Sequence, residues 1–499
     1  MTLTDPSQPT SHEIGKKVAR NAGWNYLSFG LSKGLNLVTV AILAHLLTPE
    51  LFTVVGLATL AIDYLSILND FGLGAALVHR RDRIDDASNV VFTFNFLIAL
   101  SLSTILLFAA PYIALLFKEP AITPILRWLG LSFTINSLGS VHKSRLQRDM
   151  GFGKKIIPDM GNTLIKGGLS IGCAIMGFGA WSLVYGQLAG ITVATILLWV
   201  VVPWKPRLMF DGELARQLFK YGFSIMTDRA FTIFGDSFDY LLIGLYYYQD
   251  KAALGIYTLA YRLPDLLIIN TLSVLAMVFF PAFASIQNQQ DVLRKSFLSS
   301  LRYVQLLITP LCLGMLVAAE PIIRVIFGDQ WLQAIPLMQV LSLYALVLSI
   351  GFHVGDIYKA IGRPDILLKL AIPIFIVRLT ALWIGSQYSL IGIATGHLVA
   401  ASIELVMRAI VTTRVVKVTV LEMVKQLTAF IAGILLLAFA IPALYFARDT
   451  APILQLVVVS IAGAVGYFVA VWFLERDAVL KGLRILRIAP KSMPKVSEP

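Results

Sequence analysis

The sequence contains little charge and almost no cysteine. Asp, Glu, Lys and Arg make up only 14% of its 499 residues, whereas a soluble domain carries about a quarter. Its two cysteines, Cys173 and Cys312, lie inside apolar stretches and are interpreted as small packing residues, so neither a disulfide framework nor a metal site is predicted. Walker A, HExxH and GxSxG patterns are also missing, so we expect no ATP site, no cofactor and no hydrolase centre.

Long apolar runs dominate the chain instead. Hydrophobic residues account for 57% of it, and its mean hydropathy is +0.78. A run of about 20 apolar residues is long enough to cross a bilayer core of about 30 Å. The sequence predicts about 14 such spans, at 22–46, 51–78, 88–117, 121–141, 156–177, 179–202, 218–247, 252–284, 297–319, 333–358, 365–385, 389–412, 421–446 and 451–474. We therefore expect an all-α integral membrane protein.

Basic residues are distributed unevenly among the predicted loops. With both termini placed in the cytoplasm, 31 of the 41 Lys and Arg residues fall in the terminal segments and inner loops, and only four fall in outer loops. This is the positive-inside pattern of a multi-pass membrane protein. It accounts for the net charge of +12 without a nucleic-acid partner. The first apolar stretch is longer than the core of a signal peptide, so no cleaved leader is expected.

An internal repeat divides the chain. GLATLA at 56–61 returns as GIYTLA at 255–260, and AAPYIALLF at 109–117 returns as AEPIIRVIF at 319–327. An even number of spans in each half gives both halves the same orientation in the membrane. The sequence thus predicts two parallel six-helix bundles around a central cavity, followed by two extra helices and a basic cytoplasmic tail. The predicted boundaries are 1–210, 211–415, 416–475 and 476–499. The connection at 142–155 is predicted to be a basic interfacial turn.

Charged residues inside the apolar spans mark the candidate site, because such residues are costly in a membrane unless they face a polar cavity. In each repeat the Gly and Thr of the motif continue into charge on one helix face, at Asp63 in the first copy and at Arg262 in the second. The predicted cavity residues are Lys33, Asn36, Asp63, Arg229, Asp236, Arg262 and Asp265. The candidates for ion coupling are Asp236, Asp239, His397 and Glu404.

Structural interpretations of the same residues stay open. Small and polar residues on the first helix are also typical of close helix packing. The charges of the seventh span are equally explained by a salt-bridge network to the eighth, and Arg262 is correctly spaced to pair with Asp265. Pro264 is expected to kink its helix. His397 and Glu404 are either structural contacts or parts of a proton relay.

The stretch LAHLLTPELFTVVGLATLAIDYLSILNDFGLGAALVHR at 43–80 resembles the first two helices of bacterial oligosaccharide flippases, the Wzx-type polysaccharide transporters, and is most similar to their WzxC-like branch. AIGRP at 360–364 and the stretch 336–351 resemble second-half signatures of the same family. The resemblance implies the multidrug/oligosaccharidyl-lipid/polysaccharide exporter fold and transport by alternating access. It also implies cationic cavity residues, a role that Lys33, Arg229 and Arg262 fit by position.

The resemblance implies that the protein moves undecaprenyl-diphosphate-linked oligosaccharide to the periplasmic leaflet for exopolysaccharide, capsule or O-antigen assembly. The implied partners are this lipid-linked substrate, membrane lipids, a polysaccharide polymerase and a chain-length regulator. An alternative is a proton- or sodium-coupled efflux antiporter on the same fold, which would depend on the carboxylates rather than the cations. A membrane glycosyltransferase is disfavoured because the loops are too short for a catalytic domain.

Overall fold

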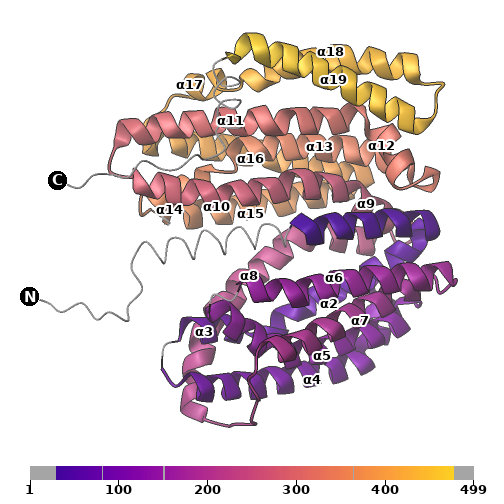
Figure 1. Cartoon of the computed structure of the whole chain (residues 1–499), viewed down its shortest axis with the longest axis vertical. Helices are drawn as coiled ribbons and strands as arrows, with labels where there is room; N and C mark the ends of the chain where they lie inside the picture. The colour runs from indigo at the N-terminus through magenta and orange to yellow at the C-terminus, as the bar shows by residue number, and fades with distance from the viewer. Residues whose placement is uncertain (1–29, 81, 150–151, 364, 477–499) are drawn as a thin grey trace, which may run out of the picture. The chain divides into compact units, whose positions relative to one another are not determined.

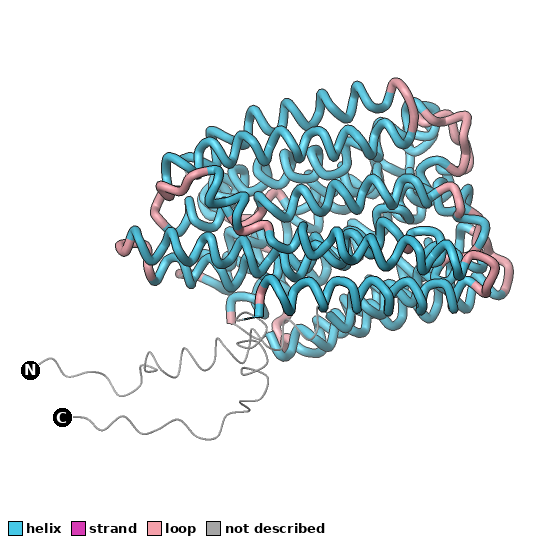
Figure 2. Tube along the Cα trace, turned by 90° about the horizontal axis from the view of Figure 1, so that it is seen from above, coloured by secondary structure: helices cyan, strands magenta, loops and turns pink. Residues whose placement is uncertain are grey.

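The computed structural model describes residues 30–80, 82–149, 152–363 and 365–476, and every regular element among them is helical (Figure 1; Figure 2). The start of the predicted span at 22–46 and the tail beyond Arg476 lie outside the described residues. The chain separates into two compact units, Met1–Thr258 and Leu259–Pro499. The two are described separately below.

The first unit consists of long helices that pack mainly as neighbours in sequence. α4 packs on α5, α6 on α7, and α8 contacts α2, α3 and α4. Its elements are a helix over Gly30–Leu46, α2 (Pro49–Asp70), α3 (Leu73–His79), α4 (Ile84–Leu116), α5 (Ile122–Arg148), α6 (Phe152–Ile175), α7 (Ala180–Val201), α8 (Gly212–Tyr246) and the start of α9 (Ala253–Pro264).

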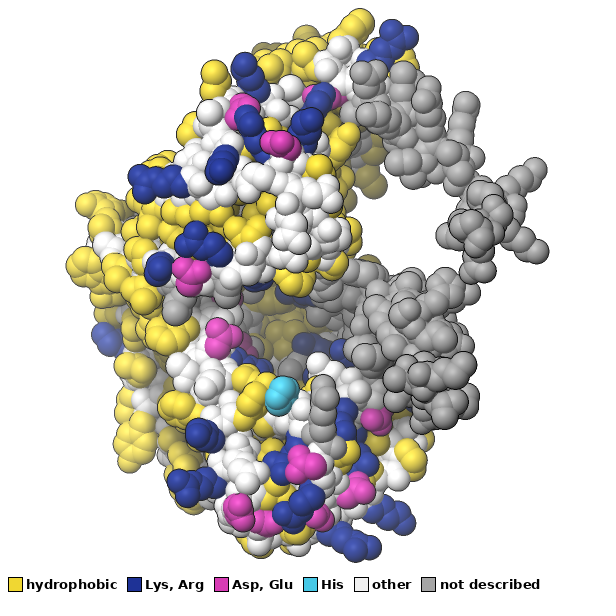
Figure 3. All heavy atoms as spheres, turned by 90° about the vertical axis from the view of Figure 1, so that its left-hand side faces the viewer, with side chains coloured by type: hydrophobic (Ala, Val, Ile, Leu, Met, Phe, Trp, Pro, Cys, Tyr) yellow, Lys and Arg dark blue, Asp and Glu magenta, His cyan; other side chains and the backbone are white. Residues whose placement is uncertain are grey.

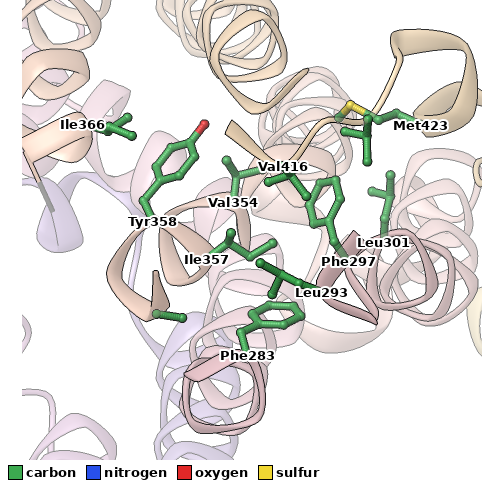
Figure 4. Close-up of a cluster of buried hydrophobic side chains, with 12 residues drawn as sticks. Phe283, Leu293, Phe297, Leu301, Val354, Ile357, Tyr358, Ile366, Val416 and Met423 are labelled. Atoms are coloured by element: carbon green, nitrogen blue, oxygen red, sulfur yellow. The ribbon is translucent and has the colours of Figure 1, made fainter. Parts of the chain in front are cut away.

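The second unit follows from the end of α9. Its elements are a π-helical turn η1 (Asp265–Ile269), α10 (Asn270–Ser285), α11 (Gln290–Val317), α12 (Ala319–Ile326), a 3₁₀ turn η2 (Asp329–Trp331), α13 (Ala334–Gly351), α14 (Val354–Ala360), α15 (Asp365–Ser386), α16 (Leu390–Val415), α17 (Val420–Lys425), α18 (Thr428–Ala447) and α19 (Pro452–Leu474). α18 and α19 lie side by side (Figure 1). Around Phe297 and Ile357, a cluster of buried side chains joins α10, α11, α14, α15 and α17 with the connection that follows α16 (Figure 4).

Membrane-length helices confirm the predicted fold class. Within the described residues, ten helical segments are long and apolar enough to cross a bilayer. The other four predicted spans coincide with the helix Gly30–Leu46 and with α5, α6 and α8, all of which belong to the first unit. Polar residues lower the hydropathy of these helices, as expected for helices that face a polar interior. The exact number of spans stays a prediction.

Three sequence-based boundaries were wrong. The span predicted at 51–78 divides into α2 and α3, because Phe71 (φ 43°) and Gly72 (φ 68°) adopt the left-handed conformation. The span predicted at 421–446 divides into α17 and α18. The basic turn predicted at 142–155 is largely helical, since α5 continues to Arg148 and α6 begins at Phe152. Cations in the last turn of α5 favour this extension through the helix dipole.

Pro264 is followed by a change of helix type. The five residues Asp265–Ile269 form a π-helical turn between α9 and α10, which is consistent with a proline that offers no backbone donor. The side-chain amide of Asn270 donates to the backbone oxygen of Asp265 at 2.8 Å and to its carboxylate at 3.3 Å. The helix at Pro264 thus continues as a π turn in which Asp265 is bound by Asn270, and the kink itself stays a prediction.

A buried carboxylate anchors the last two helices of the second unit. Glu475, just after α19, is 2% exposed. It accepts hydrogen bonds from the Arg302 guanidinium of α11 and from the Thr428 hydroxyl at the start of α18. Three helices thus meet at one carboxylate, and a charge that is buried in this way depends on its partners.

We expect Glu475→Ala to destabilise the protein, because Arg302 loses its counter-charge and Thr428 its acceptor. Breaking a buried pair costs about 3–5 kcal/mol; since Arg302 is 37% exposed, we expect about 2 kcal/mol. Thermal unfolding in detergent measures this loss as a lower melting temperature. Glu475→Gln keeps an acceptor for Thr428 and should lose less. An unchanged melting temperature for Glu475→Ala would contradict the anchoring role.

On the face that Figure 3 shows, charged side chains are numerous, and hydrophobic side chains are also exposed on it. Many large apolar residues are exposed along α15, α16, α18 and α19, such as Ile372, Val399, Ile434 and Phe473. This distribution is expected of helices whose outer faces contact lipid.

Candidate functional site

A polar cavity of about 950 Å³ lies within the first unit. It is lined by α3, α5, α6, α7 and α8, together with the end of α2 and one residue of α4, and it is open on one side. Its lining includes the cations Arg80, Lys143, Arg148, Lys155 and Arg229, the carboxylate of Asp159, the rings of His79 and Tyr221, and the amides of Asn69, Asn95, Asn136 and Asn162. A cavity of this size is large enough for a ligand of several sugar rings.

Helical periodicity brings these side chains to one face of α5 and α6. On α5 the lining residues Asn136, Ser140 and Lys143 are four and three positions apart, and Gln147 follows four positions later. Such spacing keeps residues on the same side of a helix. On α6, Lys155, Asp159 and Asn162 repeat the pattern in steps of four and three.

Glycine on α7 lets α6 approach closely enough to close the cavity wall. A Cβ atom on Gly190 would lie 2.5 Å from Oδ1 of Asn162 and 2.9 Å from its backbone oxygen. Any larger residue at position 190 would force the two helices apart. The contact therefore fixes the position of Asn162 in the wall.

Positive charge exceeds negative charge in the cavity. Among the lining residues there are five cations and one carboxylate, Asp159, which lies 3.9 Å from Nζ of Lys155. Lys143, Arg148 and Arg229 form no ion pair with any residue that the structure describes. Such an excess of positive charge favours an anionic ligand.

Arg80 has a different role. Its guanidinium donates to the carboxylate of Asp82 at 2.9 Å and to the side chain of Gln217 at 3.1 Å. Next to it the rings of His79 and Tyr221 stack with centroids 4.8 Å apart. These three residues also line a second cavity of about 440 Å³, so they form the wall between the two spaces.

Two amide oxygens in the lining have no protein donor. The Oδ1 atoms of Asn69 and Asn162 are buried and accept no hydrogen bond from the residues that the structure describes. A buried polar atom is costly when it is left unbonded. Both oxygens therefore have unused hydrogen-bonding capacity, and that of Asn162 packs against Gly190 of α7.

A helix cap and an ion pair, both formed by Asp211, hold the start of α8 in position. Asp211 caps the helix by accepting from the Leu214 N–H at 3.0 Å, and it binds Arg83 at 3.0 Å. The N–H of Leu214 and the Arg83 guanidinium both hold the pKa of the Asp211 carboxyl below its usual value. The carboxylates of Asp86 and Asp211 in turn raise the pKa of Arg83. Tyr221 and Arg229 follow on the same helix.

The cavity contains one of the predicted site residues, Arg229. Its lining, as the described residues define it, does not include Lys33, Asn36 or Asp63. Lys33 and Asn36 are half-buried on the helix Gly30–Leu46, and Asp63 is an exposed residue of α2.

Two further acidic residues of α8 differ in burial. Asp236 is exposed, whereas Asp239 is only 1% exposed. Asp239 accepts hydrogen bonds from the Tyr257 hydroxyl at 3.0 Å and from the Tyr240 N–H at 2.9 Å. These bonds give Asp239 a structural role in holding α8 to α9. They do not test its predicted part in ion coupling.

The remaining predicted residues belong to the second unit. Arg262 is half-buried on α9 and Asp265 lies in η1. Glu404 pairs with Arg408 at 2.6 Å beside a cavity of about 300 Å³, and Asp356 pairs with Lys359 at 3.5 Å in the same cavity. His397 is buried against the ring of Tyr344, at a centroid distance of 5.0 Å. Within the described residues, no group of three or more His, Cys, Asp and Glu could hold a metal ion.

Several cavity residues were missed from the sequence. Lys143, Arg148 and Lys155 lie in the segment interpreted as a surface turn, and Asn69, Asn136 and Asn162 are single amides in otherwise apolar spans. The spacing of Lys155, Asp159 and Asn162 on one helix face was a usable signal, but it becomes visible only when the helix is known to begin before Lys155.

The fold and the cavity define a multi-pass membrane protein with a cationic, amide-lined interior. A family model described as "Polysaccharide biosynthesis protein" matches residues 42–336, more than half of the chain. The chain belongs to this family, which confirms the resemblance noted in the sequence.

Known proteins agree with this assignment. Succinoglycan biosynthesis transport protein ExoT of Rhizobium meliloti (strain 1021) is 28% identical over 70% of this chain and 71% of its own. Lipopolysaccharide biosynthesis protein WzxC of Escherichia coli (strain K12) is 23% identical over 79% and 80%. The structure of the lipid II flippase MurJ in an inward closed conformation matches with a TM-score of 0.74 and 16% identity, covering 91% of this chain and 99% of that one. The last match shows a shared fold.

Proposed function

We propose that the protein is a flippase that moves undecaprenyl-diphosphate-linked oligosaccharide repeat units from the cytoplasmic to the periplasmic leaflet of the inner membrane by alternating access. The repeat units would serve exopolysaccharide, capsule or O-antigen assembly. The observation that carries the proposal is the cavity of the first unit, in which an excess of cations adjoins unbonded amide oxygens. Two relatives of the chain also support the proposal, since they are named as a succinoglycan biosynthesis transport protein and a lipopolysaccharide biosynthesis protein.

The chemistry of the cavity fits such a ligand. A diphosphate cannot cross hydrocarbon unaided, since ionised groups lose their hydration there. Lys143, Arg148 and Lys155 would bind the diphosphate through charge-assisted hydrogen bonds. The side-chain amides that line the cavity would form hydrogen bonds with sugar hydroxyls.

The rest of the proposed site and its setting come from the sequence. Both termini are proposed to be cytoplasmic, and the two six-helix repeats are proposed to span 1–210 and 211–415. A polysaccharide polymerase and a chain-length regulator are proposed as partners. The residues proposed to contact substrate during transport are Lys33, Asn36, Asp63, Arg229, Asp236, Arg262 and Asp265; those proposed for ion coupling are Asp236, Asp239, His397 and Glu404.

Complementation of a bacterial strain that lacks its polysaccharide flippase tests the function. We expect the wild type to restore surface polysaccharide and Lys155→Gln to restore roughly tenfold less, because one charge-assisted contact is lost. Lys154→Gln is the matched control, since Lys154 is exposed and does not line the cavity. Membrane levels of each variant are measured by immunoblot.

The outcomes separate the alternatives. Failure of the wild type in several such strains, together with acquired drug resistance, would replace the flippase by the efflux antiporter. Equal restoration by Lys155→Gln and Lys154→Gln would keep the function but remove Lys155 from the site. A requirement for a sugar donor in the absence of transport would indicate a glycosyltransferase.

A further inference from the structure

A short helix between two membrane-spanning helices of the second unit has its orientation fixed by polar contacts. α17 follows α16 after a four-residue connection and precedes α18. The Thr419 hydroxyl accepts from the Glu422 N–H at 3.2 Å, and the Glu422 carboxylate accepts from the Thr419 N–H at 2.8 Å. Arg294 of α11 binds the other oxygen of the same carboxylate. The Thr419 N–H, with Arg294 as a further cause, keeps the pKa of Glu422 below its usual value.

The inner side of this segment is part of the core. Val416, Val418 and Met423 are all less than 9% exposed and belong to the buried cluster in which Phe297 and Leu301 also lie (Figure 4). Because Val416 and Val418 both point inward, the residue between them, Lys417, is exposed, with a left-handed backbone at φ 57°. The core contacts therefore determine which side chains of the segment face outward.

The outer side of α17 is apolar. Val420, Leu421 and Val424 are 54%, 63% and 55% exposed, which makes half of a six-residue helix large, apolar and uncovered. A helix with such a face at the end of membrane spans is typical of the membrane interface, where its apolar side chains reach the acyl chains.

Three cations lie close to this apolar face in the sequence. Arg414, Lys417 and Lys425 are exposed, and none of them forms an ion pair with a residue that the structure describes. The sole carboxylate in the sequence from 409 to 428 is Glu422, which Arg294 and Thr419 already bind. Cations beside an interfacial apolar face favour anionic lipid headgroups.

We propose that α17 and its flanking residues form a binding site for anionic phospholipid. Arg414, Lys417 and Lys425 bind the headgroup phosphate, and Val420, Leu421 and Val424 lie among the acyl chains. A free phosphate ion would leave the apolar face uncovered. The chain's own basic tail, beyond residue 476, has the same sign of charge as the site. A phospholipid supplies both a phosphate for the cations and acyl chains for the apolar face.

Thermal unfolding of the full-length protein in neutral detergent tests the site. The protein is titrated with phosphatidylglycerol, phosphatidylcholine or inorganic phosphate. We expect phosphatidylglycerol alone to raise the melting temperature. The triple variant Arg414→Gln/Lys417→Gln/Lys425→Gln should need at least ten times more phosphatidylglycerol for the same shift. Leu421→Gln, which keeps all three cations, should weaken the response as well.

The control removes equal charge elsewhere. Lys154→Gln/Lys205→Gln/Arg216→Gln alters three exposed cations of the first unit and should respond like the wild type. The proposal is overturned if both triple variants respond alike, if the wild type does not respond, or if inorganic phosphate reproduces the shift. An unchanged response of Leu421→Gln would also overturn it, since a site for the headgroup alone would remain. These outcomes do not depend on the proposed transport function.

Discussion

The variant Lys143→Gln/Arg148→Gln is expected to bind undecaprenyl diphosphate about 100-fold more weakly than the wild type. Both side chains line the cavity of the first unit, and neither is held by an ion pair with the described residues. A hydrogen bond to a charged group contributes about 1.5–3 kcal/mol, so the loss of two amounts to roughly a hundredfold even at the lower figure. The dissociation constant of the purified protein in detergent measures the change.

Measurements at raised ionic strength and on a matched variant distinguish binding in the cavity from general attraction of the ligand to the positively charged protein. Lys205→Gln/Arg216→Gln removes the same charge from exposed positions of the same unit and should change the affinity less than threefold. Salt screens contacts of exposed charges more than those of buried ones. Since Lys143 is exposed and Arg148 is half-buried, the difference between the two double variants should shrink at raised ionic strength but not disappear. Equal weakening in both variants would mean that the cavity cations act only through the overall charge. Unaltered melting temperatures establish that both variants are folded.

Hydropathy was sufficient to predict the fold class but not the breaks within helices. A run such as 51–78 is apolar throughout, so its length predicts one span. The division at Phe71 and Gly72 depends on contact with another helix, because a Cβ on Gly72 would lie 2.3 Å from the carbonyl oxygen of Gly222 on α8. No periodicity in the run itself encodes that contact. The same reasoning applies to α17, whose start is set by the hydrogen bonds of Thr419 and Glu422.

The candidate site was predictable only where charge interrupts an apolar run. Arg229 stands out in this way and lines the cavity. Lys143 and Arg148 do not, because cations at the end of a span are indistinguishable from loop residues until the helix is seen to continue. Asn69 and Asn162 carry no charge, and their importance depends on which face of α2 and α6 is packed. Side-chain orientation is a property of tertiary packing, which composition does not record.

The second large effect, on stability, is expected at the glycine that begins each copy of the repeated motif, GLATLA and GIYTLA. Gly56 and Gly255 occupy equivalent positions in the two copies, and each faces the other copy's helix within the first unit. The N–H of Gly255 donates to the Thr53 hydroxyl at 2.8 Å. A Cβ on Gly255 would lie 2.2 Å from the carbonyl oxygen of Pro49, whereas a Cβ on Gly56 would lie 3.3 Å from the end of the Leu254 side chain. The two glycines are equivalent in sequence but not in their surroundings.

We expect Gly255→Ala to destabilise the protein by about 3 kcal/mol. For a chain of 499 residues this corresponds to a melting temperature that is lower by roughly 3 °C. The Pro49 carbonyl is backbone and cannot rotate away, so α2 and α9 must separate and the hydrogen bond to Thr53 lengthens. Alanine's higher helix propensity returns only about 1 kcal/mol. Gly56→Ala gains the same propensity against a side chain that can move, so its melting temperature should change by no more than about 1 °C.

Thermal unfolding of the two variants in detergent, beside Gly314→Ala, measures the difference. No atom lies within 4 Å of a Cβ built on Gly314, so this third variant reports the effect of helix propensity alone and should be at least as stable as the wild type. If Gly255→Ala and Gly56→Ala have the same melting temperature, the close contact between α2 and α9 is not required for stability. If all three variants are equally destabilised, glycine acts through helix flexibility. A loss confined to Gly255→Ala would mean that the motif is retained in the second copy for the backbone contact that its glycine permits.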